Sequence, residues 1–221
     1  MSVPPSANES SGLALDRVTI RIAGRALFPP LSLGVPPGVV AAVMGPSGCG
    51  KSSLLSYVCG TLEPPLFGEG RILLDGADVT ALPPERRRIG ILFQDDLLFP
   101  HMSVGENLAF GLAPSIRDRR ERRARVEAAL AAADLPGFLE RAPSTLSGGQ
   151  RARVALLRAL LAEPRALLLD EPFAKLDASL KEGFRRFVFE HAKARNLPVL
   201  LVSHDREDAA LATGSRVTLC R

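Results

Sequence analysis

Eight consecutive residues, 45–52, have the types and the order that bind a chain of phosphates. Glycines let the backbone curl so that successive N–H groups point at one anion. The apolar stretch before the run, residues 39–44, predicts a buried strand, and residues 53–58 suit the first turns of a helix. A phosphate loop requires this order of strand, loop and helix. The run is Gly45, Pro46, Ser47, Gly48, Cys49, Gly50, Lys51 and Ser52.

The chemistry that this loop predicts is the binding of a nucleoside triphosphate together with Mg²⁺. Lys51 supplies a full positive charge for the β- and γ-phosphates, and the Ser52 hydroxyl is placed to hold the metal ion. Ser53 follows in the same helix start, where free N–H groups and the helix dipole favour an anion. The alternative is a glycine-rich turn that binds nothing, and the lysine, the serine and the preceding strand together argue against it.

Two carboxylates, Asp170 and Glu171, come directly after the apolar residues 166–169. In open α/β sheets, ligands bind at the carboxyl ends of the strands, which is where such an ending places these acids. We expect Asp170 to hold Mg²⁺ through water, since that ion keeps several of its waters. Glu171 is then expected to orient and polarise an attacking water beside the γ-phosphate. A strand end with two solvated acids is the alternative, and the nearby phosphate loop disfavours it.

A third motif predicts a second anion-binding helix start. Its serine and glutamine, three residues apart, form the pattern of a capping box that opens a helix over residues 148–161. A cap does not require two consecutive glycines, which cost about 1 kcal/mol each inside a helix. The close approach of an anion to the helix start explains them. The motif consists of Leu146, Ser147, Gly148, Gly149 and Gln150.

Composition and charge limit the class of protein. The chain has 221 residues, of which 46% are hydrophobic, so it suits one domain with a substantial core. A formal net charge of +4 is too small to indicate a nucleic-acid partner. No apolar stretch reaches the roughly 18 residues that cross a bilayer. Residues 1–12 are rich in Ser and Pro, lack the features of a signal peptide and are expected to form a flexible tail.

The cysteines indicate a reducing compartment. Cys49, Cys59 and Cys220 are odd in number and lack metal-ligand spacing. A disulfide at Cys49 would obstruct the phosphate loop, so we expect a cytoplasmic protein.

The order of the expected elements predicts an α/β fold. Alternating strands and helices indicate a mainly parallel sheet covered on both faces. A helix-rich stretch, residues 95–164, interrupts this alternation and predicts an inserted subdomain. Residues 25–37 are expected to hold a short edge strand at most, and residues 63–70 a loop. The expected strands are 13–22, 39–44, 70–76, 89–93, 166–169, 198–203 and 216–219, and the expected helices are 117–133, 148–161, 179–194 and 205–212.

Gln94, Asp177 and His204 complete a set of motifs that resembles the nucleotide-binding subunit of an ABC transporter. The element at residues 146–150 is close to diagnostic of that family, whereas many NTPases share the phosphate loop. Residues 92–94 and 98–108 resemble the importer branch that serves small solutes and inorganic ions. Residues 88–95 and 145–164 are similar to a poorly characterised bacterial subgroup of that branch.

The resemblance implies a fold and a division of the chain. The fold is that of a P-loop NTPase, with a RecA-like, mainly parallel sheet, helices on both faces and an antiparallel β edge. The ABC ATPase domain would span residues 13–221. Its core would comprise residues 13–94 and 165–221, and its helical subdomain residues 95–164.

The resemblance also implies a mechanism in which two copies of the chain face each other head to tail. Each ATP would lie between the phosphate loop of one copy and residues 146–150 of the other. Gln94 would touch Mg²⁺ and the attacking water, His204 would hydrogen-bond the γ-phosphate, and Asp177 would link the two sites. The alternatives are an ordinary strand-end glutamine, an exposed loop histidine and an acid at a helix N-terminus.

ATP hydrolysis would drive solute import through separate transmembrane permease subunits, together with a solute-binding protein and without nucleic acid. The expected location is the cytoplasmic face of the inner membrane. Three alternatives remain open: the ATPase subunit of an exporter, a soluble ATPase of the same family, and a P-loop kinase of a small metabolite. The kinase would leave residues 147–150 unexplained.

The sequence departs from the family at the base of the nucleotide. The family commonly places an aromatic residue near the end of the first strand to stack on adenine. The corresponding position is near Ile22, which is not aromatic, and Phe28 is the nearest candidate. The arginines of residues 117–125 predict a solvated helix face, with contact to a membrane partner or acidic lipid as the alternative.

Overall fold

The computed structural model describes residues 11–219, apart from the side chain of Ser179, and divides them into two compact units. The first unit contains residues 11–91, 165–171 and 192–219, and the second contains residues 92–164 and 172–191. Residues 172–191, which the sequence grouped with the strand-bearing core, therefore make their contacts in the second unit. The predicted tail lies outside the described residues except for Ser11 and Gly12, and Cys220 lies outside them as well.

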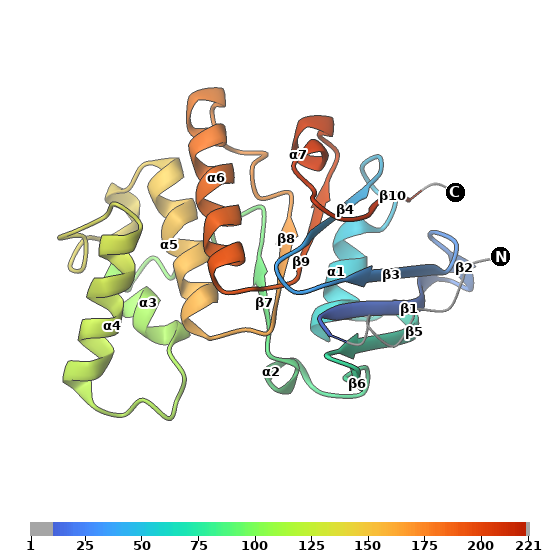
Figure 1. Cartoon of the computed structure of the whole chain (residues 1–221), viewed down its shortest axis with the longest axis horizontal. Helices are drawn as coiled ribbons and strands as arrows, with labels where there is room; N and C mark the ends of the chain where they lie inside the picture. The colour runs from blue at the N-terminus through green and yellow to red at the C-terminus, as the bar shows by residue number, and fades with distance from the viewer. Residues whose placement is uncertain (1–10, 220–221) are drawn as a thin grey trace. The chain divides into compact units, whose positions relative to one another are not determined.

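A parallel sheet, in the order β10–β4–β9–β8–β7, organises the first unit (Figure 1). Its strands β4, β8 and β9 are almost wholly apolar and buried, as expected for a sheet that helices cover on both faces. Ala41 and Val43 of β4 join the core that contains α1, whereas Ala42 and Met44 pack with α7 on the other face. The predicted sheet with helices on both faces is confirmed. The elements are β4 (Val40–Met44), α1 (Lys51–Cys59), α2 (Pro84–Arg87), β7 (Ile89–Leu92), β8 (Ala166–Asp170), β9 (Val199–Ser203), α7 (Arg206–Ala210) and β10 (Arg216–Thr218).

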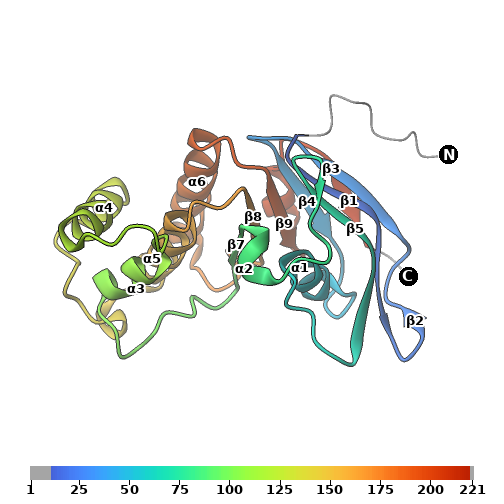
Figure 2. The ribbon, with the colours of Figure 1, turned by 90° about the horizontal axis from the view of Figure 1, so that it is seen from below.

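An antiparallel sheet is built around β1 in the same unit. This strand pairs with β2, β3 and β5, and β6 extends the sheet from β5. Helix α1 contacts β1 and β5 of this sheet and β8 of the parallel sheet, so it lies between the two (Figure 2). The strands are β1 (Leu13–Ile22), β2 (Arg25–Ala26), β3 (Leu31–Val35), β5 (Leu66–Leu74) and β6 (Ala77–Asp78).

Two expectations about this sheet were wrong. Strand β5 begins at Leu66, so most of the segment expected as a loop is strand. The glycine that suggested the loop, Gly70, has φ 95° and lies where β1 bulges; a Cβ there would lie 2.5 Å from the Arg17 carbonyl oxygen. Residues 25–37 hold two short strands rather than one at most, because the prolines fall outside β2 and β3.

The second unit is helical. Helix α3 begins with a capping box between Ser103 and Glu106, and α4 begins with Asp118 as its N-cap. No helix in the described part of the chain combines the length and the apolar character that a membrane span needs. The elements are α3 (Val104–Gly111), α4 (Arg119–Ala132), a 3₁₀ turn (Pro143–Thr145), α5 (Gly148–Leu161) and α6 (Ala178–Ala194), whose last residues fall in the first unit.

Candidate functional site

The phosphate loop joins β4 to α1 and leaves backbone donors free at the helix start. Gly50 has φ 98° and caps α1, and the first intrahelical bond runs from the Leu54 N–H to the Gly50 carbonyl at 2.9 Å. The first N–H groups of a helix, here those of Lys51, Ser52 and Ser53, have no acceptor within it. Gly48 has φ 79°, with open space where a Cβ would lie. These donors and the positive end of α1 together form an anion site.

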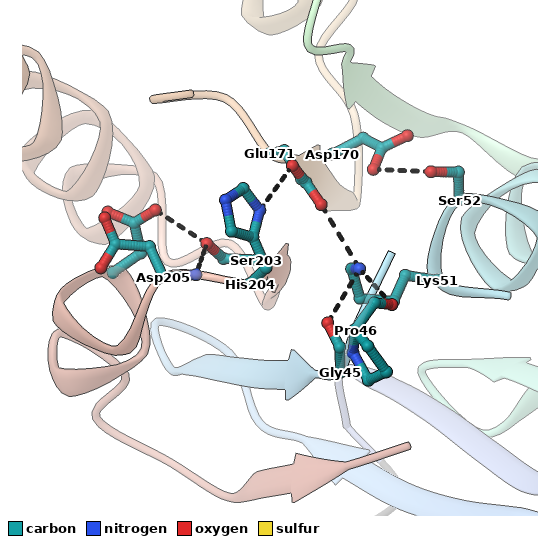
Figure 3. A network of polar contacts seen from close by, with 10 residues as sticks. Gly45, Pro46, Lys51, Ser52, Asp170, Glu171, Ser203, His204 and Asp205 are labelled. Atoms are coloured by element: carbon teal, nitrogen blue, oxygen red, sulfur yellow. Dashed lines mark hydrogen bonds and ion pairs between the residues drawn. The ribbon is translucent and has the colours of Figure 1, made fainter. Parts of the chain in front are cut away.

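Lys51 lies under this loop with only 5% of its surface exposed. Its Nζ donates to the carbonyl oxygens of Gly45 at 3.0 Å and Pro46 at 3.1 Å, and lies 3.4 Å from Glu171 Oε1 (Figure 3). A buried ammonium requires such partners because removing its charge from water is costly. The contacts hold the positive charge beside the helix start, where a phosphate would add to them.

Glu171 connects Lys51 to His204. One carboxylate oxygen faces the ammonium, and the other, Oε2, lies 2.8 Å from Nδ1 of His204 (Figure 3). The Glu171 side chain is 16% exposed and its φ is +46°, a left-handed conformation that non-glycine residues rarely adopt. Strained backbone of this kind occurs at functional sites. The ends of β8 and β9 thus bring a carboxylate and an imidazole to the phosphate loop, at the sheet edge where α/β proteins bind ligands.

Asp170 and Ser52 form a pair of oxygen ligands beside this group. The Ser52 hydroxyl donates to Asp170 Oδ1 at 3.1 Å. Burial raises the pKa of Asp170, against the opposing hydrogen bond from Ser52. A hydroxyl and a carboxylate are hard oxygen ligands that suit Mg²⁺, which takes its remaining ligands from water and phosphate. The described residues include no cluster of three or more His, Cys, Asp or Glu suited to a metal. The donor set therefore fits an ion that substrate and water hold in large part.

A buried polar network supports the turn that carries His204, and sequence reasoning missed it. The Ser203 hydroxyl accepts the Asp205 N–H at 3.0 Å (Figure 3). It also donates to Asp208 Oδ2 at 2.8 Å. Ser203 and Asp208 are both buried, and Asp205 is the N-cap of α7. One signal was available: a serine ends an otherwise apolar strand and an N-cap acid follows two residues later.

The third motif lies in the second unit, at the start of α5, and its predicted capping box is confirmed. The Ser147 N–H donates to Gln150 Oε1 at 2.9 Å, and the Gln150 N–H donates to Ser147 Oγ at 3.3 Å. Packing within the chain does not require the glycines between them. An added Cβ would meet its nearest neighbours at 3.9 Å for Gly148 and at 3.5 Å for Gly149, which are ordinary contact distances.

Gln94 and Asp177 also belong to the second unit, and both are exposed. Gln94 comes two residues after β7. Asp177 occupies the N-cap position of α6, since its carbonyl accepts the N–H groups of Leu180 and Lys181 at 2.9 Å each. The expected roles of Gln94, Asp177 and residues 146–150 at a bound ATP stay predictions.

The candidate for base stacking has no free face. Phe28 is 2% exposed and belongs to the core, and its ring lies 3.1 Å from where a Cβ on Gly50 would be. Ile22, at the end of β1, is exposed. Phe28 therefore supports the phosphate loop from within and is not available to adenine.

Known proteins are similar to this chain in sequence and in fold. The sequence model of the ABC transporter family matches residues 28–174. An uncharacterised ABC transporter ATP-binding protein of Escherichia coli K12, YnjD, is 45% identical over 89% of this chain and 90% of its own length. The Fe(3+) ions import ATP-binding protein FbpC 1 of Pectobacterium atrosepticum is 43% identical over 91% of this chain. The chain spans only 56% of the length of that ATP-binding protein.

A solved structure extends the likeness to the fold. The dimeric structure of a post-hydrolysis state of the ATP-binding cassette MJ0796, bound to ADP and Pi, superposes with a TM-score of 0.78. It shares 29% sequence identity and covers 94% of each chain. With the phosphate loop and the acids beside it, these comparisons lead to one conclusion: the chain belongs to the ABC transporter family, as one of its ATP-binding proteins.

Proposed function

We propose that this chain hydrolyses ATP to energise the import of a small solute or ion through separate permease subunits. The observation that carries the proposal is the contact of Glu171 with both Lys51 and His204 at the mouth of the phosphate loop. The names of its relatives favour import: several are Fe(3+) ions import ATP-binding proteins. An iron substrate belongs to those proteins, and the solute class proposed for this chain is broader.

Each side chain of the site has a role that follows from its position. Lys51 and the free N–H groups of α1 hold the β- and γ-phosphates of the substrate ATP. Glu171 accepts a proton from the attacking water and orients it, while Lys51 keeps the carboxylate in place. His204, which reaches the same carboxylate, donates to the γ-phosphate. Ser52 and Asp170 would hold Mg²⁺, which neutralises phosphate charge when it is bound.

A second copy of the chain completes each site in this proposal. The helix start at residues 147–150 offers free N–H groups and a positive dipole end but lacks a lysine. The described residues would meet a Cβ on either glycine only at ordinary contact distances, so they do not explain the two glycines, which favours a ligand that approaches from outside. The dimeric state of the solved relative supports the same arrangement. Asp177 would link the two sites, and Gln94 would reach the metal and the attacking water.

The helical second unit is the proposed contact with the permease. Leu97 and Phe110 are large apolar side chains that are more than half exposed in this unit. Exposed apolar side chains of this size favour a protein partner, and docking there would place the chain at the cytoplasmic face of the membrane. In the proposed division, the helical subdomain spans residues 95–164. Gln94 is then the last residue of the ATP-binding core before the subdomain that would contact the permease.

Replacing Glu171 by Gln tests the proposal. We expect Glu171→Gln to bind ATP and to form an ATP-dependent dimer. Its rate of ATP hydrolysis should fall by about 100-fold or more, because the amide cannot accept the proton of the water. ATP turnover, measured with no added phosphate acceptor, and sedimentation with ATP check the two halves.

Glu182→Gln is the matched control, since Glu182 is an exposed acid of α6 that pairs with Arg186 at 3.8 Å. Turnover at the wild-type rate in Glu171→Gln would contradict the proposed role. A wild-type chain that turns over ATP only when a small acceptor is supplied would favour the kinase instead.

A further inference from the structure

Two arginines of α5 fasten this helix to the segment that follows Gln94. Arg151 and Arg158 are seven residues apart, so they lie on one side of the helix. Arg151 Nε lies 3.2 Å from Asp96 Oδ2. Arg158 donates to the carbonyl oxygens of Leu97 at 2.9 Å and Asp96 at 3.3 Å. All of these residues belong to the second unit, so the contacts form a joint between α5 and residues 96–97 within that unit.

The guanidinium of Arg151 also holds the residue before the helix cap. Its Nη1 donates to the Leu146 carbonyl at 2.8 Å, and Leu146 is buried. One side chain therefore fixes both the chain entering α5 and the carboxylate of Asp96. The Ser147 cap follows Leu146 directly. We therefore infer that the two contacts of Arg151 orient the first N–H groups of α5.

The charges at this joint compensate each other. A cation near a helix N-terminus is repelled by the helix dipole, so Arg151 is unfavourable there unless an anion faces it. Asp96 is that anion. Burial raises the pKa of Asp96, against the pull of Arg151, so the carboxylate is held there at some cost. Its neighbour Asp95 pairs instead with Lys175.

We propose that Asp96 and Arg151 are positioning residues for the half-site at residues 147–150, and that their ion pair aims the start of α5 at the ATP of the second copy. This inference rests on the proposed function, in which that ATP is bound between two copies. The pair lies in the second unit, whereas Lys51, which would bind the chain's own nucleotide, lies in the first. Loss of the pair should therefore weaken dimerisation and leave the chain's own nucleotide binding intact.

The test compares dimerisation with nucleotide binding in the Glu171→Gln parent. Arg151→Met removes both contacts of the guanidinium, Arg151→Lys keeps the charge, and Asp96→Ala removes only the carboxylate. We expect the dimerisation constant, from sedimentation at saturating Mg-ATP, to weaken about tenfold in Arg151→Met, as the loss of charge-assisted hydrogen bonds implies. Binding of a fluorescent ATP analogue to the dilute chain should be unchanged. Adding Asp96→Ala to Arg151→Met should have little further effect, since the two act together.

Arg125→Met is the matched control. Arg125 lies in the same unit, is 42% exposed against 40% for Arg151, and also makes two contacts, with Glu121 and Glu163. It should dimerise like the parent. If Arg151→Met is unstable by thermal melting, Asp96→Ala, which also removes the ion pair, carries the test.

Three outcomes would overturn the inference, and they can be told apart. A parent that dimerises with ATP, with the position 151 and 96 variants dimerising equally well, contradicts this inference alone. A parent that stays monomeric with ATP contradicts the proposed function, and this inference with it. Equal losses of dimerisation and of nucleotide binding would indicate a general structural role and would also overturn it.

Discussion

At the residue scale, a glycine is most informative about function when neither its backbone conformation nor its packing requires it. Gly50 and Gly70 have left-handed backbones, and a Cβ at either would crowd a neighbour, so their own surroundings explain them. Gly149 differs, because its φ is not positive and a Cβ would rest 3.5 Å from the flexible Leu180 side chain. The part of the chain that the structure describes therefore gives no packing reason for this glycine, and we attribute it to the ATP of the second copy.

We predict that Gly149→Ala separates stability from activity. Alanine is favoured over glycine in a helix by up to about 1 kcal/mol, so the melting temperature should hold or rise. The added methyl should displace the ATP of the second copy, and a displacement of about 1 Å can cost about 100-fold in rate. Thermal melting and ATP turnover measure the two effects.

Gly183→Ala is the control for this substitution. It makes the same change in α6, where a Cβ would meet nothing within 4 Å. It should stabilise the chain similarly and leave turnover unchanged. If Gly149→Ala hydrolysed ATP at the wild-type rate, the second half-site would need another location.

The sequence predicted the residue types at the site better than their contacts. The capping box of α5 could be predicted because a three-residue spacing sets its geometry locally. The contact between Glu171 and Lys51 could not, since the two are 120 residues apart and meet only when β4 and β8 join one sheet. The buried pair of Ser203 and Asp208 escaped notice because each residue alone suits a strand end or a helix turn.

At the scale of elements, helix α1 is held at both ends. Its start carries the phosphate loop, and its end meets the buried guanidinium of Arg87, which is 5% exposed. Arg87 donates to the carbonyls of Tyr57 at 2.7 Å and Val58 at 2.9 Å. The same group donates to Thr80 and, at 2.8 Å, to Leu82. A cation at the C-terminus of a helix is favourable, and here it also ties α1 to α2.

We predict that Arg87→Met destabilises the fold by about 2 to 4 kcal/mol, because it leaves several buried carbonyls without donors. Urea unfolding measures the free energy, and Arg86→Met, an exposed change one residue earlier in α2, should cost much less. Equal stability of the two variants would mean that water replaces the guanidinium without loss.

The antiparallel sheet marks the limit of prediction from local pattern. Residues 66–70 contain two glycines, which local preference assigns to a loop. Pairing with β1 overrides that preference: Glu69 lies opposite Thr19, and Gly70 fits the bulge. Strands β4, β8 and β9 of the parallel sheet could be recognised without such a partner, because almost all of their residues are apolar and buried.

At the scale of the whole molecule, the chain carries two helix starts that we propose to bind anions, and they lie in different units. One lies beside Lys51, the Ser52–Asp170 pair and Glu171, whereas the other is a capped helix start with two glycines. In the proposed function, neither is a complete site without the complementary half from a second copy. Two copies related by a two-fold axis would complete both sites at once.

We predict that two inactive variants restore each other when mixed. Lys51→Ala removes the charge of the first half-site, and Gly149→Asp adds a negative charge to the second, so each should be inactive alone. A mixed dimer has one site with both halves intact. With random pairing, half of the dimers are mixed and each has one of two sites, so ATP turnover should recover to at most about a quarter of the wild-type rate.

Pairs of variants that damage the same half-site provide the control for this recovery. Lys51→Ala mixed with Ser52→Ala leaves every phosphate loop in every dimer defective, so no turnover should return. If that mixture recovered as well, exchange of copies could not explain the rate.

If Lys51→Ala and Gly149→Asp stayed inactive together although the wild-type chain loses specific activity on dilution, the dimer would need both sites intact for hydrolysis. A wild-type chain with constant specific activity at every dilution would contradict the two-copy site, because a lone chain would then hydrolyse ATP unaided.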